Sequence, residues 1–314
     1  MGKYLFRRLG FLLLTFLVTS LLVFTVTQLL PGDVARVILG REAGEAAVQA
    51  LREQLGLNAP PPLQYLNWLG NFITGDWGQS FSTKSAILPL VMGRVRNSLM
   101  LAAVTLVISV PVAVILGVIA GLNENRVVDN LISISSLSVV GLPEFVTGLV
   151  LIEIFAFRLR LLPANSSIRP ESSFGEALPM LILPALTATL VLLAYIARLT
   201  RAGVIEEMKQ SYVRTADLKG LPRRTVIVKH VLRNALMPTI TVIAISFGWL
   251  ISGLIVIENV FNYPGLGRLL VFAIDRRDLP LLQAVTLVTV LGFALANMAA
   301  DFLYAYLNPR IRLG

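Results

Sequence analysis

The sequence predicts an all-α polytopic membrane protein with six transmembrane helices. Of its 314 residues, 56% are hydrophobic and only 14% are charged, whereas soluble domains usually carry about 25% charged residues. Six apolar stretches are long enough to cross a bilayer core of about 30 Å, because a helix rises ~1.5 Å per residue. With six spans, both termini lie on the same side of the membrane.

The first apolar stretch, residues 9–30, follows the basic residues Lys3, Arg7 and Arg8. Its length exceeds the apolar core of a cleavable signal peptide, about 7–15 residues, and no small-residue cleavage site follows it. We therefore expect an uncleaved first transmembrane helix. The other five expected spans are Leu99–Leu122, Ser136–Phe157, Leu178–Ala197, Pro238–Ile257 and Leu281–Tyr304.

Basic residues are concentrated in segments that these spans place on one side. Segment 198–236 has nine basic and three acidic residues, a net charge of +6. Segments 31–98, 158–176 and 258–280 are nearly neutral. The positive-inside rule then places both termini and segment 198–236 in the cytoplasm, and segment 31–98 outside. These loops account for the net charge of +9, so we expect membrane lipid rather than nucleic acid around the chain.

We therefore predict three parts along the chain. Residues 1–30 form the N-terminal cytoplasmic end and transmembrane helix 1, residues 31–98 an extracytoplasmic segment, and residues 99–314 a five-helix core. In the second helix, Gly117 and Gly121 have the spacing that lets two helices approach closely in lipid. We expect them to pack within this chain.

The outer segment 31–98 is not expected to span the membrane. Its stretch Glu45–Leu55 is amphipathic, with Val48 and Leu51 on the same face as Leu55, and three prolines at 60–62 interrupt the chain. It is predicted to be either a small cap on the outer surface or a docking surface for an external partner.

Residues for several kinds of chemistry are missing from the sequence. There is no cysteine and a single histidine, His230, so we expect neither thiolate chemistry nor a His-rich metal site. No G-x-x-x-x-G-K-[ST] loop is present to bind a nucleotide phosphate. Asp301 is the one aspartate within an expected span, and we expect it to be structural. We therefore expect no covalent catalysis and no cofactor bound by this chain.

The basic segment 198–236 is expected to form two short helices joined by a tight corner. Apolar residues recur every four positions from Val204 to Ala216, among charged residues, which is typical of a surface helix. Gly220 can take the left-handed conformation that ends this helix, and Pro222 suits the first turn of the next one. Such a surface can bind either a protein partner or anionic lipid.

Several motifs follow one another along nearly the whole chain. The central one is Tyr212-x-Arg214-Thr215-Ala216-x-x-Lys219-Gly220-Leu221, followed by Arg233-Asn234-Ala235-Leu236-x-Pro238. The others are Leu30-Pro31-Gly32-Asp33, Tyr65-x-x-Trp68-Leu69, Gly75-Asp76-x-Gly78-x-Ser80, Glu258-x-x-Phe261-x-x-Pro264-Gly265-Leu266-Gly267, Ala273-x-x-x-Arg277-Asp278-x-Pro280, Asp301-x-x-Tyr304 and Pro309-Arg310-Ile311-Arg312.

In this order the motifs resemble ABC-importer permeases of the dipeptide/oligopeptide/nickel branch, in the first-subunit (DppB/OppB-like) version. The central motif is similar to the EAA loop of these permeases. Arg214 and Thr215 replace its opening residues, Arg233 stands where many relatives have proline, and Asn308 replaces an aspartate. The loop residues that the resemblance assigns to coupling with an ATPase are Tyr212, Arg214, Thr215, Ala216, Asp217, Lys219, Gly220 and Leu221.

The resemblance implies the type I ABC importer permease fold in a prokaryotic inner (plasma) membrane. In such permeases the cytoplasmic helix pair docks on an ATPase subunit, and we expect Gly220 to supply the corner and Ala216 a small face for the partner. The implied partners are a homologous second permease, two ATP-binding subunits that hold ATP and magnesium, and an extracytoplasmic substrate-binding protein.

The function implied is ATP-driven alternating access, with this chain forming half of a pathway for di- and oligopeptides. Nickel chelates, glutathione or sugars are alternative substrates for the same architecture. An ion-coupled secondary transporter and an intramembrane enzyme are the alternatives from other classes.

Two carboxylates lie in the third expected span. Glu144 follows Pro143 and stands where relatives often have a neutral residue, so it is the candidate pathway residue, able to attract a peptide amino terminus. Glu153 lies nine residues later, on the opposite side of one continuous helix. We expect it to reach the outer interface or to pair with Arg158 or Arg160.

Overall fold

The computed structural model describes residues 2–29, 36, 39, 42–54, 58–168 and 172–307. Within these ranges the chain is helical, and its one strand-like feature is an isolated bridge between Gln79 and Ala86. The motifs Leu30–Asp33 and Pro309–Arg312, together with Asn308, lie outside the described residues. The predicted all-α class is confirmed.

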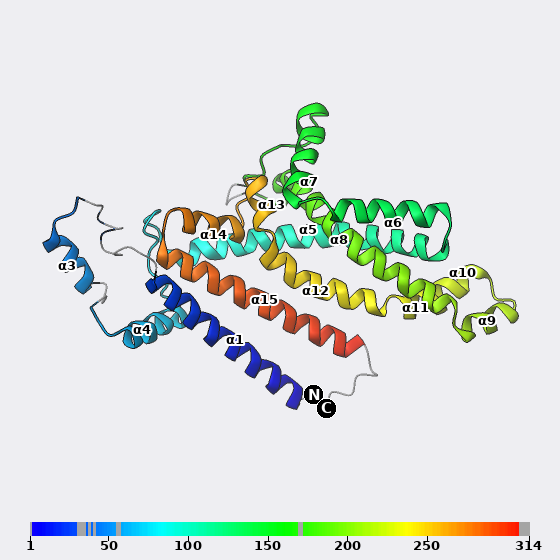
Figure 1. Ribbon diagram of the computed structural model, residues 1–314, viewed down its shortest axis with the longest axis horizontal. Coiled ribbons are helices and arrows are strands. Elements are labelled where there is room, and N and C mark those ends of the chain that lie inside the picture. Colours follow the sequence, from blue (N-terminus) through cyan, green and yellow to red (C-terminus); the bar gives the residue numbers. More distant parts are fainter. Residues whose placement is uncertain are drawn as a thin grey trace. The chain divides into compact units, whose positions relative to one another are not determined.

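The chain divides into two compact units, whose helices are labelled and coloured along the sequence in Figure 1. Residues 1–97 and 265–292 make the first unit, and residues 98–264 and 293–314 make the second. Residues 265–292, which the sequence places in the core, belong to the first unit in the structure.

The core of the first unit forms where two distant stretches of sequence meet. Ile87 and Val91 are fully buried and cluster with Leu266, Leu269 and Leu281. The unit consists of α1 (Gly2–Leu29), α3 (Glu45–Gln54), α4 (Pro61–Thr74), the start of α5 (Ile87–Leu122), α14 (Leu266–Asp275) and the start of α15 (Leu279–Leu307).

Helix α3 confirms the amphipathic helix expected in the outer segment. Val48, on its predicted apolar face, is 1% exposed. The side chains of Leu51 and Leu55 lie outside the described part of the chain.

Helix α4 was not predicted, because the three prolines at 60–62 were interpreted only as an interruption. Pro61 and Pro62 occupy the first two helical positions, where a missing N–H costs nothing and the fixed φ favours the helix. The helix ends at Gly75, whose φ of 89° is the left-handed conformation that glycine adopts readily.

Helices α1 and α4 pack against each other in antiparallel directions. Gln28 Nε2 donates a hydrogen bond to Gln64 Oε1 over 2.9 Å at one end. At the other end, the ring centroids of Phe16 and Phe72 are 6.2 Å apart. From the first contact to the second, the residue number decreases in α1 and increases in α4. Helix α4 therefore lies antiparallel along the C-terminal half of α1.

Two of the sequence motifs meet where α15 begins. The Ser80 hydroxyl donates to Asp278 Oδ2 over 2.6 Å, and both residues are at most 1% exposed. The Ser82 N–H donates to the same oxygen over 3.0 Å. Asp278 Oδ1 accepts from the Leu281 N–H over 3.4 Å, so this one carboxylate both begins α15 and fixes the 80–82 turn.

In the second unit, α8 packs against α6, α7, α11 and α12. Its core joins Leu181 and Ile196 of α8 to Leu250, Phe261 and Tyr263. All five side chains are fully buried. The remaining elements are α6 (Val127–Val140), α7 (Glu144–Leu151), the π-helical segment η1 (Ile152–Arg158), α8 (Phe174–Met208), α9 (Ser211–Leu218), α10 (Arg223–Thr225), the π-helical segment η2 (Val226–Val231), α11 (Leu232–Ala235), α12 (Met237–Gly253) and α13 (Ile255–Val260).

The glycine pair of α5 packs against α8, as predicted for contact within the chain. A Cβ on Gly117 would lie 2.6 Å from the Ala197 carbonyl oxygen, and one on Gly121 would lie 2.7 Å from Val204 Cβ. No side chain fits at such distances. The two glycines therefore let the backbones of α5 and α8 approach closely.

The expected third span, Ser136–Phe157, is wrong as a single helix. The chain turns by 105° between Val127–Val140 and Glu144–Arg158. Pro143 precedes α7 with φ −59° and ψ 139°, an extended conformation that cannot continue α6. Glu144 and Glu153 both lie in the helical segment Glu144–Arg158 after the turn, Glu153 near the start of its π-helical part η1.

Four described helices are long and apolar enough to cross a membrane: α1 over Phe6–Leu29, α5, α8, and α15 over Leu279–Phe302. Two bent pairs, α6 with α7–η1 and α10–α11 with α12, bring the number to six if each pair makes one crossing. The six predicted apolar stretches overlap these elements, although residue 30 lies outside the described residues and Pro238–Ile257 continues past α12 into α13.

Candidate coupling surface and pathway residues

The basic segment folds into the expected helix pair. It lies between the C-terminal end of α8 and the start of α12, in the second unit (Figure 1). The predicted amphipathic helix is split, because α8 runs to Met208 and α9 begins at Ser211. This break turns α9 back toward α8. Apolar residues of α9 can then pack on Val204.

The corner between α9 and α10 has the predicted geometry. Gly220 has φ +70°, its N–H donates to the Asp217 carbonyl over 3.0 Å, and the Leu221 N–H donates to the Ala216 carbonyl over 3.3 Å. Pro222 directly precedes α10. The left-handed glycine therefore satisfies the last carbonyls of α9 and reverses the chain.

The underside of the helix pair is a small apolar core of its own. Val204, Val226 and Val231 are at most 1% exposed, and Val213 is 3% exposed. Ala235 closes the cluster from α11. A Cβ on Gly203 would lie 2.4 Å from the Ala235 carbonyl oxygen, so α8 and α11 touch through their backbones.

The expectation that Ala216 offers a small face to another protein is wrong. Ala216 is 7% exposed and belongs to the apolar core below the corner. Its small side chain lets α9 approach the rest of this chain. The sequence periodicity identified the apolar face but gave no sign of what would cover it.

Tyr212 fastens α9 to its neighbours. Its hydroxyl donates to Glu207 Oε2 of α8, accepts from Asn234 Nδ2 over 3.3 Å, and lies 3.4 Å from the His230 carbonyl oxygen. Burial raises the pKa of Tyr212, and the bond to Glu207 raises it further. Tyr212 is therefore a neutral hydrogen-bonding group that holds the helix pair together.

The outer side of the corner combines cationic and apolar residues. Leu218 is 80% exposed, Val228 58% and Leu221 38%. These exposed apolar residues and the exposed polar residues near them form the candidate coupling surface. Leu218 and Val228 were not among the predicted site residues, although an apolar residue between Asp217 and Lys219 is a signal visible in the sequence. The exposed polar residues of this candidate coupling surface are Arg214, Thr215, Asp217, Lys219, Arg223 and Arg224.

A bidentate ion pair links α6 to the C-terminal part of α8. Arg201 Nε donates to Asp129 Oδ1 over 2.5 Å, and Nη2 donates to Oδ2 over 2.7 Å. The Asp129 side chain is 1% exposed and also accepts from the Asn125 N–H over 2.9 Å. Such planar, doubly bonded pairs fix orientation as well as distance. Sequence reasoning assigned no role to Asp129.

The candidate pathway residue Glu144 lies in the first turn of α7, directly after the 105° turn, and is half-buried. A carboxylate at this position faces the positive end of the helix dipole. Glu153 is exposed and accepts a hydrogen bond from Arg158 Nε over 3.0 Å, which confirms the predicted pairing. Asp301 is partly buried in α15.

Comparisons with known proteins agree with these features. Residues 113–313 match the family described as "Binding-protein-dependent transport system inner membrane component". Residues 1–102 match the N-terminal family of the same transport systems.

Relatives resemble this chain over its whole length. The probable peptide ABC transporter permease protein y4tP of Sinorhizobium fredii is 37% identical over 99% of this chain and 100% of its own length. The glutathione transport system permease protein GsiC of Escherichia coli K12 is 37% identical over 99% of both chains. GsiC of Shigella flexneri has the same identity and coverage.

A permease of this kind works with ATP-binding and substrate-binding partners, and several apolar helices hold it in the inner membrane. The chain therefore belongs to the binding-protein-dependent transport system inner membrane components, as a multi-pass permease component of an ABC importer.

Proposed function

We propose that this chain forms half of a pathway for di- and oligopeptides, driven by ATP through alternating access between outward- and inward-open states. Two full-length relatives support the peptide part. One is named a probable peptide permease and the other a glutathione permease. Glutathione is itself a tripeptide, so it is the second candidate substrate, and both names indicate ligands with amide groups and an amino terminus.

The observation that carries the ATP-driven part is the exposed coupling surface. Its apolar tip at Leu218 and Leu221 is surrounded by cationic side chains. A protein groove with acidic edges would cover the leucines and fix the register through the charges. We assign this role to an ATP-binding subunit, with ATP and magnesium held by two such subunits. A homologous second permease completes the pathway, and an extracytoplasmic protein delivers the substrate.

In this proposal both termini and the coupling surface lie in the cytoplasm, because the basic residues are concentrated there. The C-terminal end of α1 and helix α4 then lie toward the outside. A reporter enzyme that works only in the cytoplasm should be active when it is fused within 205–230. A reporter inserted near Asn58 should be active only if it is one that works outside the membrane. A cytoplasmic signal from position 58 would contradict this orientation.

Glu144 is proposed to face the pathway and to attract cationic groups. Its place directly after the non-helical residues 141–143 supports this role, because irregular backbone at membrane depth is stable beside protein or a wet cavity rather than lipid. The variant Glu144→Gln should weaken uptake of cationic peptides more than that of anionic ones. Equal uptake of both, at equal expression, would make Glu144 a structural residue.

The function is tested by uptake of labelled trialanine and glutathione in cells that contain the complete importer and no other peptide importer. We expect saturable uptake that requires the binding protein and intact ATP sites on the partner subunits. Uptake of a nickel chelate or sugar, with neither peptide, contradicts the peptide assignment. Uptake that persists without the ATP-binding subunits indicates an ion-coupled transporter instead.

A further inference from the structure

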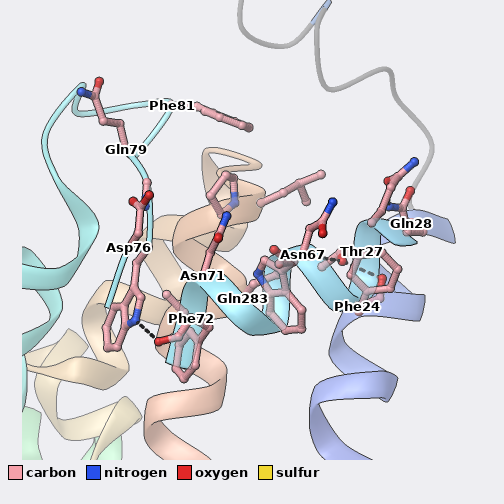
Figure 2. A pocket seen from close by; sticks show the side chains of 17 residues that line it. Phe24, Thr27, Gln28, Asn67, Asn71, Phe72, Asp76, Gln79, Phe81 and Gln283 are labelled. Atoms are coloured by element: carbon pink, nitrogen blue, oxygen red, sulfur yellow. Dashed lines mark hydrogen bonds between the residues drawn. The ribbon is translucent and has the colours of Figure 1, made fainter. Parts of the chain in front are cut away.

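A cavity of about 390 Å³ lies entirely within the first unit (Figure 2). Its walls come from the end of α1, one side of α4, the turn 76–81 and the start of α15. The volume lies in the range of about 300–1,000 Å³ that small-molecule sites occupy. No role in the coupling or pathway described above accounts for it.

The amide side chains that line the cavity follow one face of α4. Gln64, Asn67 and Asn71 are spaced three and four residues apart, so they lie above one another on the helix. The adjoining side of α4 packs its aromatic residues on α1 through Trp68 and Phe72, which also reach the cavity. The amide face is therefore fixed in direction by the packing of the aromatic face.

Part of this polar wall is exposed to solvent and makes no side-chain hydrogen bond within the described part of the chain, so a ligand can replace water there. Gln28 is bonded to Gln64, and Gln283 Nε2 donates to Thr27 Oγ1 over 2.7 Å. Among the described residues, the side-chain amides of Asn67, Asn71 and Gln79 have no hydrogen-bond partner, although each lines the cavity. Each amide offers both a donor and an acceptor, which is the pattern that a peptide group requires.

One carboxylate completes the cavity. Asp76 is the single ionisable residue among those that line it, and its Oδ1 accepts from the Gly78 N–H over 3.2 Å. Figure 2 shows the polar ends of Asp76, Asn71, Asn67 and Gln28 in one row, pointing to the same side. A row of amides that ends in an unneutralised carboxylate favours an extended ligand with a positive charge at one end.

Aromatic side chains form the apolar part of the walls. Trp77 stacks on Phe72 with ring centroids 4.7 Å apart, and the Trp77 Nε1–H donates to the Phe72 carbonyl over 2.9 Å. Trp68 and Phe81 also line the cavity. Aromatic faces attract ammonium groups and cover small apolar side chains. The indoles are held in place by contacts within this chain, so the walls exist before a ligand arrives.

We propose that this cavity is a second, outer substrate site, which binds the amino-terminal end of a peptide. The ammonium group would lie at Asp76, and the first peptide groups would bond to Asn67, Asn71 and Gln79. This inference rests on the proposed function and its orientation, in which the end of α1 lies on the outer side. It adds a site that selects for a free amino terminus.

The chain contains its own reporter for this site. Of its three tryptophans, Trp68 and Trp77 line the cavity, and Trp249 lies in the second unit. The full-length Trp249→Phe variant in lipid nanodiscs therefore emits from the cavity alone. Trialanine has no aromatic residue and is the probe. We expect a saturable change in emission with trialanine, and at least about tenfold weaker binding of N-acetyl-trialanine, which lacks the ammonium group.

In the same background, Asp76→Asn and Asn71→Leu should each weaken trialanine binding by at least about tenfold. Two control variants should leave it unchanged: Glu53→Gln removes an exposed acid from α3, and Thr74→Val changes α4 outside the cavity. Thermal unfolding of all variants checks that each is folded. No saturable change, equal binding of the acetylated peptide, or no effect of Asp76→Asn would overturn the proposal.

Uptake of trialanine by the complete importer separates this inference from the proposed function. If trialanine is taken up but the change in tryptophan emission is the same with and without Asp76→Asn, the outer site is refuted and the peptide function stands. Binding at the cavity without uptake of any peptide supports the site and refutes the function.

Discussion

Ser80 and Asp278, 198 residues apart in the sequence, share a hydrogen bond of 2.6 Å in the core of the first unit. The same carboxylate accepts from the backbone at Ser82 and at Leu281. One buried side chain therefore fastens the turn beside the outer cavity to the start of α15.

Replacing this carboxylate should loosen the first unit. Asp278→Ala removes a helix cap and leaves the Ser80 hydroxyl without its acceptor, so we expect a loss of about 2–4 kcal/mol. Thermal unfolding of the purified chain measures the loss. Asp275→Ala, an exposed aspartate three residues earlier, is the matched control and should change stability by less than about 0.5 kcal/mol. Equal effects of the two variants would contradict the capping role.

The same substitution, glycine to alanine, should have different effects on stability at two positions of α8. Gly203→Ala puts a methyl group 2.4 Å from the Ala235 carbonyl oxygen and should cost about 1–3 kcal/mol or more, because backbone must move. Gly175→Ala meets nothing within 4 Å and should be neutral or slightly stabilising. Thermal unfolding of both variants tests this, and an unchanged Gly203→Ala would show that α8 and α11 are less closely packed.

The corner at Gly220 should depend on backbone conformation alone. A Cβ there would meet nothing within 4 Å, yet φ is +70°. Gly220→Ala should therefore lower uptake through a strain of about 1–2 kcal/mol, and Gly220→Val should lower it more. Gly220→Asn should retain most activity, because asparagine tolerates this conformation better. If all three variants transport equally, the corner does not have to hold its shape.

Substitutions at two nearby positions of α9 should distinguish a residue that stabilises this chain from one that binds the ATP-binding subunits. Ala216→Leu overfills the apolar core below the corner and should destabilise the chain by about 1–3 kcal/mol. Leu218→Ser, at a position 80% exposed, should leave stability nearly unchanged while reducing co-purification of the ATP-binding subunits. The lipid-anchor alternative predicts that Leu218→Ser weakens liposome binding instead and retains the subunits.

Sequence features with a local cause were predicted well. Gly220 ends a helix because of its own conformational freedom, and Gly117 marks a close contact because no other residue is as small. The pairing of Glu153 with Arg158 also follows from their separation along the chain. In each case the residue type alone restricts the structure.

Features that depend on distant residues were missed. The burial of Ala216 depends on the break at Lys209–Gln210 that turns α9 back, and nothing in that dipeptide signals a break. Asp129 was assigned no role because its partner, Arg201, lies 72 residues away. The outer cavity was missed for the same reason, since its walls join residues 24–28, 64–81 and 279–284.

During biosynthesis, the 105° turn between α6 and α7 cannot form in isolation. The 14 residues of α6 reach only about 21 Å, short of the roughly 30 Å that an inserted helix must cross. A crossing at this place therefore needs α6 together with α7 and η1, the whole of Val127–Arg158. Phe261, which lies 3.1 Å from a Cβ on Gly148 of α7, is synthesised 113 residues after that glycine. The contact between α7 and Phe261 can therefore form only after residue 261 has been synthesised.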